Sequence, residues 1–227
     1  MIWFASALAA TIMVPKDADL QEAVDTAVDG DTILVATDFV PSSAWVEYFE
    51  KDLTIEGDGG IANLPPIHAF DAGLTLRSVR ISDSDFNVWP VLVLANGDAR
   101  SALLEDVHLE QNHERAAFEA QNAGSLEVEI RDSTFTANSG DGAIQLAYSS
   151  LVVEGCTFTG NDNWSGGGAI WTRQASSVEI SWSTFEDNIS AKEGGRSPSS
   201  KAGEPRSRSP AATSTTTWLR PGAAIST

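Results

Sequence analysis

Acidic residues with basic neighbours are the part of this sequence that could do chemistry. A polysaccharide lyase needs carboxylates that hold Ca²⁺ and neutralise a uronate, with an Arg or Lys that takes the C5 proton. The candidates of these types are Asp83, Asp85 and Asp106, with Arg80 or Arg131 as the base. A glycoside hydrolase would instead need two carboxyl groups about 5–9.5 Å apart. Asp is common in turns for structural reasons and no second motif points at these residues, so we assign no catalytic residue.

Histidine and cysteine give no metal or redox motif. His68, His108 and His113 share no metal-ligand spacing, so we interpret them as surface histidines and expect no metal site. Cys156 is the only cysteine, which excludes an intrachain disulfide and favours inert packing over a nucleophile. We expect no cofactor; only the lyase alternative would need Ca²⁺.

Tryptophan offers a possible carbohydrate platform. Trp164 and Trp171 flank the glycine-rich turn at 166–168, and Trp182 interrupts an otherwise polar column of the repeat described below. Exposed indole rings can stack on sugars, but such residues also pack loops. We favour loop packing and keep carbohydrate or another cell-surface component as the candidate partner.

Charge narrows the classes of partner. With 14 basic and 32 acidic residues, the formal net charge is −18, which argues against nucleic acid or an anionic membrane as partner. No apolar run approaches the roughly 18 residues of a membrane-spanning helix.

The two ends differ from the middle of the chain. Residues 1–9 are apolar and end on Ala7-Leu8-Ala9, which fits the A-x-A cleavage site of a secretory signal peptide. Residues 196–227 are basic and rich in Ser, Pro and Arg, a composition that predicts disorder. The repeat described below keeps its register to Gly195 and stops at Arg196. A truncated repeat domain followed by a reading-frame shift explains that break, and a natural linker is the alternative.

One helix is expected, near the start of the chain. Apolar residues fall on one helical face across 17–29, Asp17 or Asp19 can cap its start, and Gly30 suits a left-handed residue beyond its end. A strand follows at 31–36, and no other helical period is present.

A repeat fills the rest of the chain to residue 195. Five eight-residue segments have apolar residues at their first, third and eighth positions, and start at Leu74, Ala102, Val128, Leu151 and Val178. Their eighth positions (81, 109, 135, 158 and 185) are 28, 26, 23 and 27 residues apart. Short strands with such a period predict a parallel β-helix, in which each repeat is one coil about 4.8 Å above the last. We therefore expect an all-β, right-handed parallel β-helix, with a cap at 11–30 and about six rungs at 31–195.

Stacking the repeats assigns columns of side chains. An Asn stands three residues after the eighth position in four copies; we expect these to hold tight turns in left-handed conformation and to bond from rung to rung: Asn112, Asn138, Asn161 and Asn188. Phe135, Phe158 and Phe185 should stack in the core. The fourth position should face solvent with alternating charge, through Arg77, Glu105, Arg131 and Glu154.

Two stretches resemble known β-helix families. The phrase from Leu20 to Val35 looks like the cap and first strand of pectate-lyase-like, right-handed β-helix proteins. The Phe-x-x-Asn motifs, with Gly-Ala-Ile at 142–144 and Gly-Gly-Ala-Ile at 167–170, are similar to the repeats of polymorphic outer-membrane proteins. The resemblance implies a secreted or cell-surface module. A non-catalytic, adhesin-like role is our leading expectation, and a carbohydrate-active lyase or hydrolase is the alternative, because one fold hosts many functions.

Overall fold

The computed structural model describes residues 9–16, 18–84, 88–96, 100–164, 166–174 and 177–190, without the side chains of 122–125. Several sequence-based predictions lie outside this part of the chain. They concern Asp17, Asp85, all but the last residue of the predicted signal peptide, and the segment 196–227.

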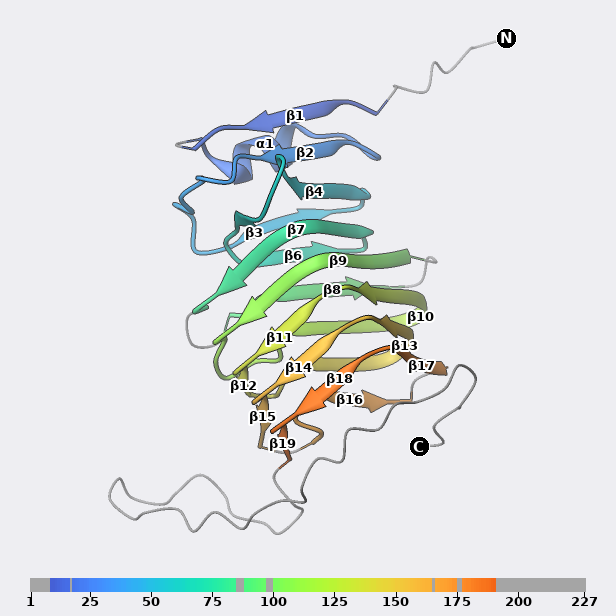
Figure 1. Cartoon of the computed structure of the whole chain (residues 1–227). Coiled ribbons are helices and arrows are strands. Elements are labelled where there is room, and N and C mark those ends of the chain that lie inside the picture. Colours follow the sequence, from blue (N-terminus) through green and yellow to red (C-terminus); the bar gives the residue numbers. More distant parts are fainter. Residues whose placement is uncertain are drawn as a thin grey trace, which may run out of the picture.

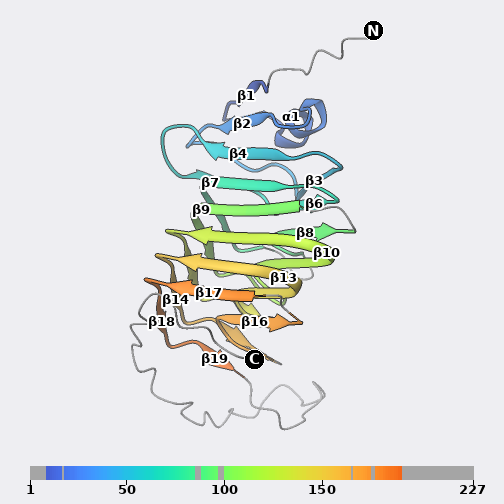
Figure 2. The same ribbon diagram turned by 90° about the vertical axis from the view of Figure 1, so that its right-hand side faces the viewer.

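The described chain winds into a stack of parallel strands, so the prediction of an all-β parallel β-helix is confirmed (Figure 1). The first face of the coil runs from the N-terminal end through β1 (Thr11–Val14), β2 (Thr32–Val35), β4 (Leu53–Gly57), β7 (Leu74–Ser82), β9 (Arg100–Glu110), β10 (Phe118–Arg131), β13 (Ile144–Glu154) and β17 (Ser177–Ser181). Figure 2 shows these strands lying across the stack like the rungs of a ladder.

Two further faces and a small sheet complete each coil. The second face consists of β3 (Val46–Phe49), β6 (Ile67–Phe70), β8 (Val91–Ala95), the first parts of β10 and β13, and β16 (Ile170–Arg173). The third face consists of β5 (Ala62–Asn63), the last parts of β7 and β9, β11 (Thr134–Thr136), β14 (Thr157–Thr159) and β18 (Thr184–Glu186). A separate three-stranded sheet contains β12 (Ser139–Gly140), β15 (Asp162–Asn163) and β19 (Ile189–Ser190).

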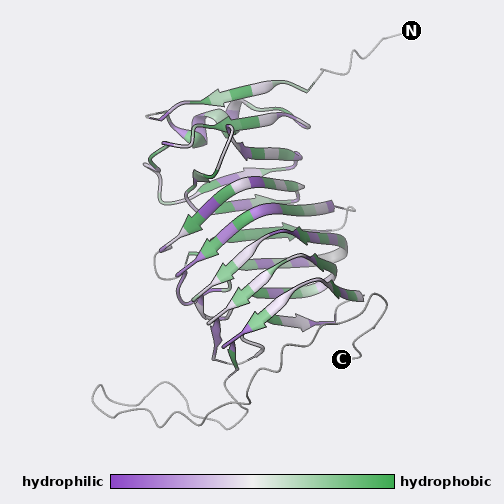
Figure 3. Cartoon of the chain, in the orientation of Figure 1, coloured by the Kyte–Doolittle hydropathy of each residue, from purple (hydrophilic) through white to green (hydrophobic). Residues whose placement is uncertain are grey.

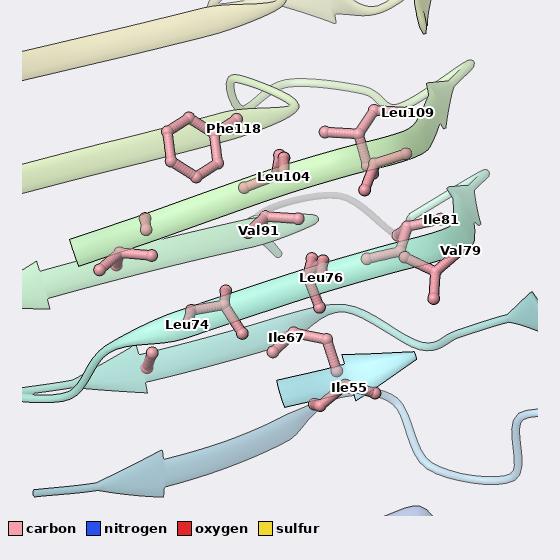
Figure 4. Close-up of a cluster of buried hydrophobic side chains, with 14 of the residues drawn as sticks. Ile55, Ile67, Leu74, Leu76, Val79, Ile81, Val91, Leu104, Leu109 and Phe118 are labelled. Atoms are coloured by element: carbon pink, nitrogen blue, oxygen red, sulfur yellow. The ribbon is translucent and has the colours of Figure 1, made fainter. Parts of the chain in front are cut away.

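Apolar residues at alternate positions build the core. Along each strand, apolar and polar residues alternate, which Figure 3 shows as alternating colours on the ribbon. Leu76, Leu104 and Ile130 are fully buried and occupy the same position in successive coils. Figure 4 shows how such side chains from neighbouring coils fill the interior. The register of the coils matches the one expected from the repeat: Phe135 pairs with Phe158, and Phe158 pairs with Phe185.

The N-terminal cap is shorter than the sequence pattern predicts. Helix α1 spans Leu20–Thr26, and the Asp19 side chain accepts a hydrogen bond from the Gln21 backbone N–H at its start. Gly30 is left-handed, as predicted, but the helix already ends at Ala27 with an extended backbone, so Gly30 does not terminate it. Lys51 from the next coil explains the early end. Its Nζ donates to the carbonyl oxygens of Val24 and Ala27, which satisfies the last turn without a left-handed residue.

Left-handed residues turn the chain at the corners, but they are not the predicted ones. The four column asparagines have no positive φ; the residue immediately before each one does, namely Gln111, Ala137, Gly160 and Asp187. A second corner column has the same conformation at Ser78, Asp106, Asp132, Gly155 and Trp182. The prediction of left-handed asparagines is therefore wrong by one residue. The buried amides are needed to bond the coils above and below, and the preceding residue makes the turn.

Candidate functional site

The residues considered for lyase chemistry occupy corners and outer strand positions. Asp83 and Asp106 are both left-handed corner residues, and Asp106 accepts a hydrogen bond from Ser78 Oγ at 2.9 Å. His108 Nε2 lies 3.6 Å from Asp106 Oδ1, and Arg80 Nε lies 3.8 Å from Glu110 Oε1. The third face thus brings Arg80, Asp106 and His108 together with Glu110, which the sequence analysis did not single out. Within the described residues, which do not include Asp85, no three His, Cys, Asp or Glu side chains are placed to hold a metal ion.

Arg131 is separate from that group. It stands in register between Glu105 and Glu154, as the repeat predicts. Its Nη2 nevertheless pairs with Glu129, two residues earlier on its own strand, and Arg77 makes the ion pair with Glu105 at 2.9 Å. The charge column is thus partly satisfied within one strand rather than between coils.

The three histidines have different environments. His68 retains only 8% of its surface, so its interpretation as a surface histidine is wrong. Its Nε2 lies 2.8 Å from the backbone oxygen of Trp89, and burial lowers the pKa of its imidazole. His108 is half-buried, and exposed His113 lies 2.8 Å from Ser139 Oγ through its Nδ1.

Aromatic side chains gather on the outside of the second face. We call Trp45, Phe49, His68, Phe70 and Trp89 the aromatic face. The Phe49 and Phe70 rings stack at 5.0 Å between centroids, and the Trp45 and His68 rings lie nearly parallel at 6.4 Å. The edge of His68 also meets Trp89 at 6.5 Å. Trp45 and Phe49 are 46% and 58% exposed, so this face presents large apolar rings to solvent.

A groove adjoins the aromatic face at the N-terminal end. It has a volume of about 520 Å³ and is lined by residues of α1, β3 and the segments beside β3: Gln21, Asp25, Trp45, Glu47, Tyr48, Phe49 and Lys51. Trp45 and Phe49 belong to both the groove and the aromatic face. The two features therefore form one continuous surface of rings and carboxylates.

A buried carboxyl group lies on the same face, three coils beyond β3. Glu119 is 5% exposed; Trp89 Nε1 donates to its Oε2, and Gln121 Nε2 donates to its Oε1. Burial raises the pKa of Glu119, although these two hydrogen bonds oppose the shift. The Arg115 guanidinium lies 4.4 Å from the centroid of the Trp89 ring, a cation–π contact. Burial also raises the pKa of the neighbouring Asp141.

The tryptophans singled out in the sequence do not make this surface. Trp164 and Trp182 are 57% and 65% exposed, and Trp171 packs beside Gly166. No stacked ring pair joins these three residues, all of which the structure describes. The turn at 166–168 thus gives no shared platform.

Sequence reasoning missed the aromatic face although a signal was present. Val46-Glu-Tyr-Phe49 and Ile67-His-Ala-Phe70 pair residue by residue, with a spacing of 21. The five-copy repeat covers only the first and third faces, so the sequence analysis did not detect this 21-residue spacing on the second face.

Comparison with known proteins agrees with this geometry. Residues 90–196 match the family model described as "Right handed beta helix region". This stretch is a right-handed β-helix. The β-helix matches no curated protein and no solved structure. In the part of the chain that the structure describes, no helix is long and apolar enough to cross a membrane.

Proposed function

We propose that this β-helix is a secreted or cell-surface module that binds glycans on its aromatic face and does not cleave them. The supporting observation is the exposure of Trp45 and Phe49, each of which lies over a ring of the next coil. Contiguous exposed apolar rings, unlike single ones, often mark a binding site. The C–H faces of a sugar can pack on the rings while its hydroxyl groups bond to nearby carboxylates and amides.

The shape of the surface also favours an extended ligand. The rings come from successive coils, so they form a row along the axis of the β-helix. The groove beside α1 continues that row. A chain of sugar units could therefore contact several rings at once, each adding a weak interaction.

The proposed location rests on the sequence. The apolar residues 1–9 are typical of a secretory signal, and the Phe-x-x-Asn and Gly-Gly-Ala-Ile motifs resemble the repeats of polymorphic outer-membrane proteins. Glycan binding suits a module at a cell surface, where polysaccharides are abundant.

Binding to immobilised oligosaccharides tests the proposal. The double variant Trp45→Ala/Phe49→Ala should bind its best glycan about tenfold more weakly, since each lost ring contact costs about 0.5–1.5 kcal/mol. Trp182→Ala removes a ring that is even more exposed, at the other end of the β-helix, and should bind like the parent. Equal losses in both variants, or no glycan bound at millimolar concentration, would refute the proposal.

A glycoside hydrolase is the second candidate, and Glu119 is the observation that favours it. A carboxyl group whose pKa is raised by burial can act as a general acid, and this one adjoins the aromatic face through Trp89. Release of reducing ends from a bound glycan, abolished by Glu119→Gln with binding retained, would establish this second function. Intact glycan after prolonged incubation would exclude it.

A further inference from the structure

The groove between α1 and β3 has an unusual balance of polar groups. Gln21, which could donate to a sugar, is already committed to the protein. Its Nε2 donates to Asp25 Oδ1 at 2.7 Å and to the Glu47 carbonyl oxygen at 2.9 Å, and its Oε1 accepts from the Glu47 N–H at 2.9 Å. The amide therefore holds α1 against β3 and has no N–H left for a ligand.

Lys51, the cation that lines the groove, is also committed. Its Nζ donates to the carbonyl oxygens of Val24 and Ala27, at 2.6 and 2.9 Å. The ammonium group thus neutralises the carbonyl end of α1, where the helix dipole is negative. Its single charge is outnumbered by the two carboxylates, Asp25 and Glu47, that line the same groove.

The acidic groups, in contrast, are available. Glu47 is exposed, and its carboxylate makes no hydrogen bond to any described residue. Asp25 is exposed and uses only Oδ1, which accepts from Gln21. The groove therefore offers acceptors and negative charge beside two exposed aromatic rings. His68, next to Trp45, adds little to offset this charge, since burial lowers the pKa of its imidazole and so disfavours the charged form.

The charge of the whole chain adds to the local charge. The formal net charge of −18 produces a negative field that repels anionic ligands and concentrates cations near the surface. A cation is further stabilised over Trp and Phe rings by the negative faces of their π systems.

We infer that the groove selects cationic glycans, namely oligosaccharides that carry free amino groups. This inference rests on the proposed glycan-binding function and names the ligand class. The sugar ring would lie on Trp45 and Phe49, and its ammonium group would face Glu47 and Asp25. Uronic-acid and sulfated glycans would be rejected by both the local and the overall charge.

Isothermal titration with three oligomers of equal length tests the inference. The probes are oligoglucosamine, its fully N-acetylated form and oligogalacturonate, at pH 6 and low salt. We expect oligoglucosamine to bind at least tenfold more tightly than the N-acetylated oligomer, and oligogalacturonate not to bind. The double variant Asp25→Asn/Glu47→Gln should reduce that tenfold preference to less than threefold and leave affinity for the N-acetylated oligomer unchanged. Glu186→Gln, which removes an exposed carboxylate at the far end, should keep the preference.

Other outcomes separate the two proposals. Equal affinity for the amino and N-acetylated oligomers would overturn the cationic preference and leave glycan binding intact. No binding of any oligomer would overturn both proposals. A Lys-rich peptide of the same charge that binds more tightly than oligoglucosamine would overturn the assignment to sugar and make the groove a peptide site.

Discussion

The side-chain amide of Asn138 donates a hydrogen bond to Oδ1 of Asn161 across 2.9 Å, deep inside the β-helix. The same Nδ2 donates to the carbonyl oxygen of Leu109 in the preceding coil at 2.9 Å. Asn112 and Asn161 repeat this pattern, and Asn188 accepts from Asn161 at the end of the described column, so the amides link four successive coils. Because each amide bonds to the coil before it and the coil after it, the column fixes the register of the corners.

Removal of one amide from this column should destabilise the protein strongly. Asn138→Ala removes the partner of the Asn112 backbone N–H and of one Asn112 side-chain N–H, and it removes the bond to the Leu109 carbonyl. Oδ1 of Asn161 loses one of its two donors and keeps the backbone N–H of residue 138. Each unsatisfied group costs about 1–3 kcal/mol, so we expect a loss of at least about 3 kcal/mol in urea unfolding.

Asn188→Ala is the matched control. Asn188 is half-buried and ends the described column, so water can replace part of what the variant loses, and the loss should be about half as large. If Asn138→Ala and Asn188→Ala lost equal free energy of unfolding, the inner amides of the column would not contribute more than its last one, and the prediction would be wrong.

The phenylalanine stack makes a second prediction about stability. The Phe158 ring lies parallel to Phe135 at 4.8 Å and to Phe185 at 4.7 Å and is fully buried. Phe158→Ala should cost about 3–5 kcal/mol, because it removes a large side chain between two well-packed neighbours. Thr157→Ala, one residue away on the outside, should cost less than about 0.5 kcal/mol. Similar losses for the two variants in thermal unfolding would show that the inward and outward positions are exchanged.

The sequence predicts the register of these columns well and their local conformation poorly. Phe158 and its partners align because apolar residues at fixed positions in five copies define inside and outside together. The conformation at Asn138 is a different matter, since Asn favours both left-handed turns and buried amide bonds. Only the neighbouring coils decide between these roles, and they place the left-handed turn on Ala137.

The burial of His68 on the aromatic face could not be predicted, for a related reason. His68 looks like an ordinary surface residue in the sequence, because nothing local shows that Trp45, Phe70 and Trp89 surround it. These neighbours are brought together by the length of each coil, which varies with the insertions between strands. Burial of Glu119 depends on the same packing.

Charge reversal at Arg131 tests the outer column. Arg131→Glu would place a carboxylate in register with Glu105 and Glu154 and beside Glu129. We expect the melting temperature to fall by several degrees at low salt and by much less at about 0.5 M salt, because exposed charges are screened over a few ångströms there. Arg131→Gln removes the positive charge without adding a negative one, so its melting temperature should fall less than that of Arg131→Glu. A decrease that salt does not change would argue for a packing role.

The raised pKa of Glu119 predicts a dependence of stability on pH. A carboxyl group whose pKa is higher in the folded than in the unfolded state binds protons preferentially when folded. Its contribution to stability is therefore complete below the ordinary Glu pKa and is lost as the pH rises through the raised value. Relative to the parent, Glu119→Gln should gain melting temperature as the pH increases from 4 to 8. For Glu186→Gln, which changes an exposed residue, the difference in melting temperature from the parent should not vary with pH. A difference that does not vary with pH for Glu119→Gln would contradict the burial of the Glu119 carboxyl group.

A second polar column runs through the corner that holds Cys156. Ser133 Oγ accepts from the N–H of Val107 at 3.0 Å, and Ser183 Oγ accepts from the N–H of Cys156 at 3.1 Å. Between them, Cys156 Sγ takes a backbone hydrogen bond from Ser133 and donates to the Glu154 carbonyl at 3.3 Å. Each of the two serines also donates its hydroxyl group to the backbone carbonyl two residues earlier in the chain. The Cys156 thiol therefore makes the same two kinds of hydrogen bond as the serine hydroxyl groups in this column.

Substitutions of Cys156 should therefore be ranked by hydrogen bonding rather than by hydrophobicity. Cys156→Ser keeps both bonds and should change the free energy of unfolding by less than about 1 kcal/mol. Cys156→Val matches the thiol in size and apolar character but leaves the Ser133 N–H buried and unpaired, at a cost of about 1–3 kcal/mol. Burial raises the pKa of the Cys156 thiol to about 11, so the parent should also resist thiol reagents at pH 8 until it unfolds. Urea unfolding of the two variants, with thiol labelling of the parent, tests this. A valine variant as stable as the serine variant would show that packing alone sets this corner.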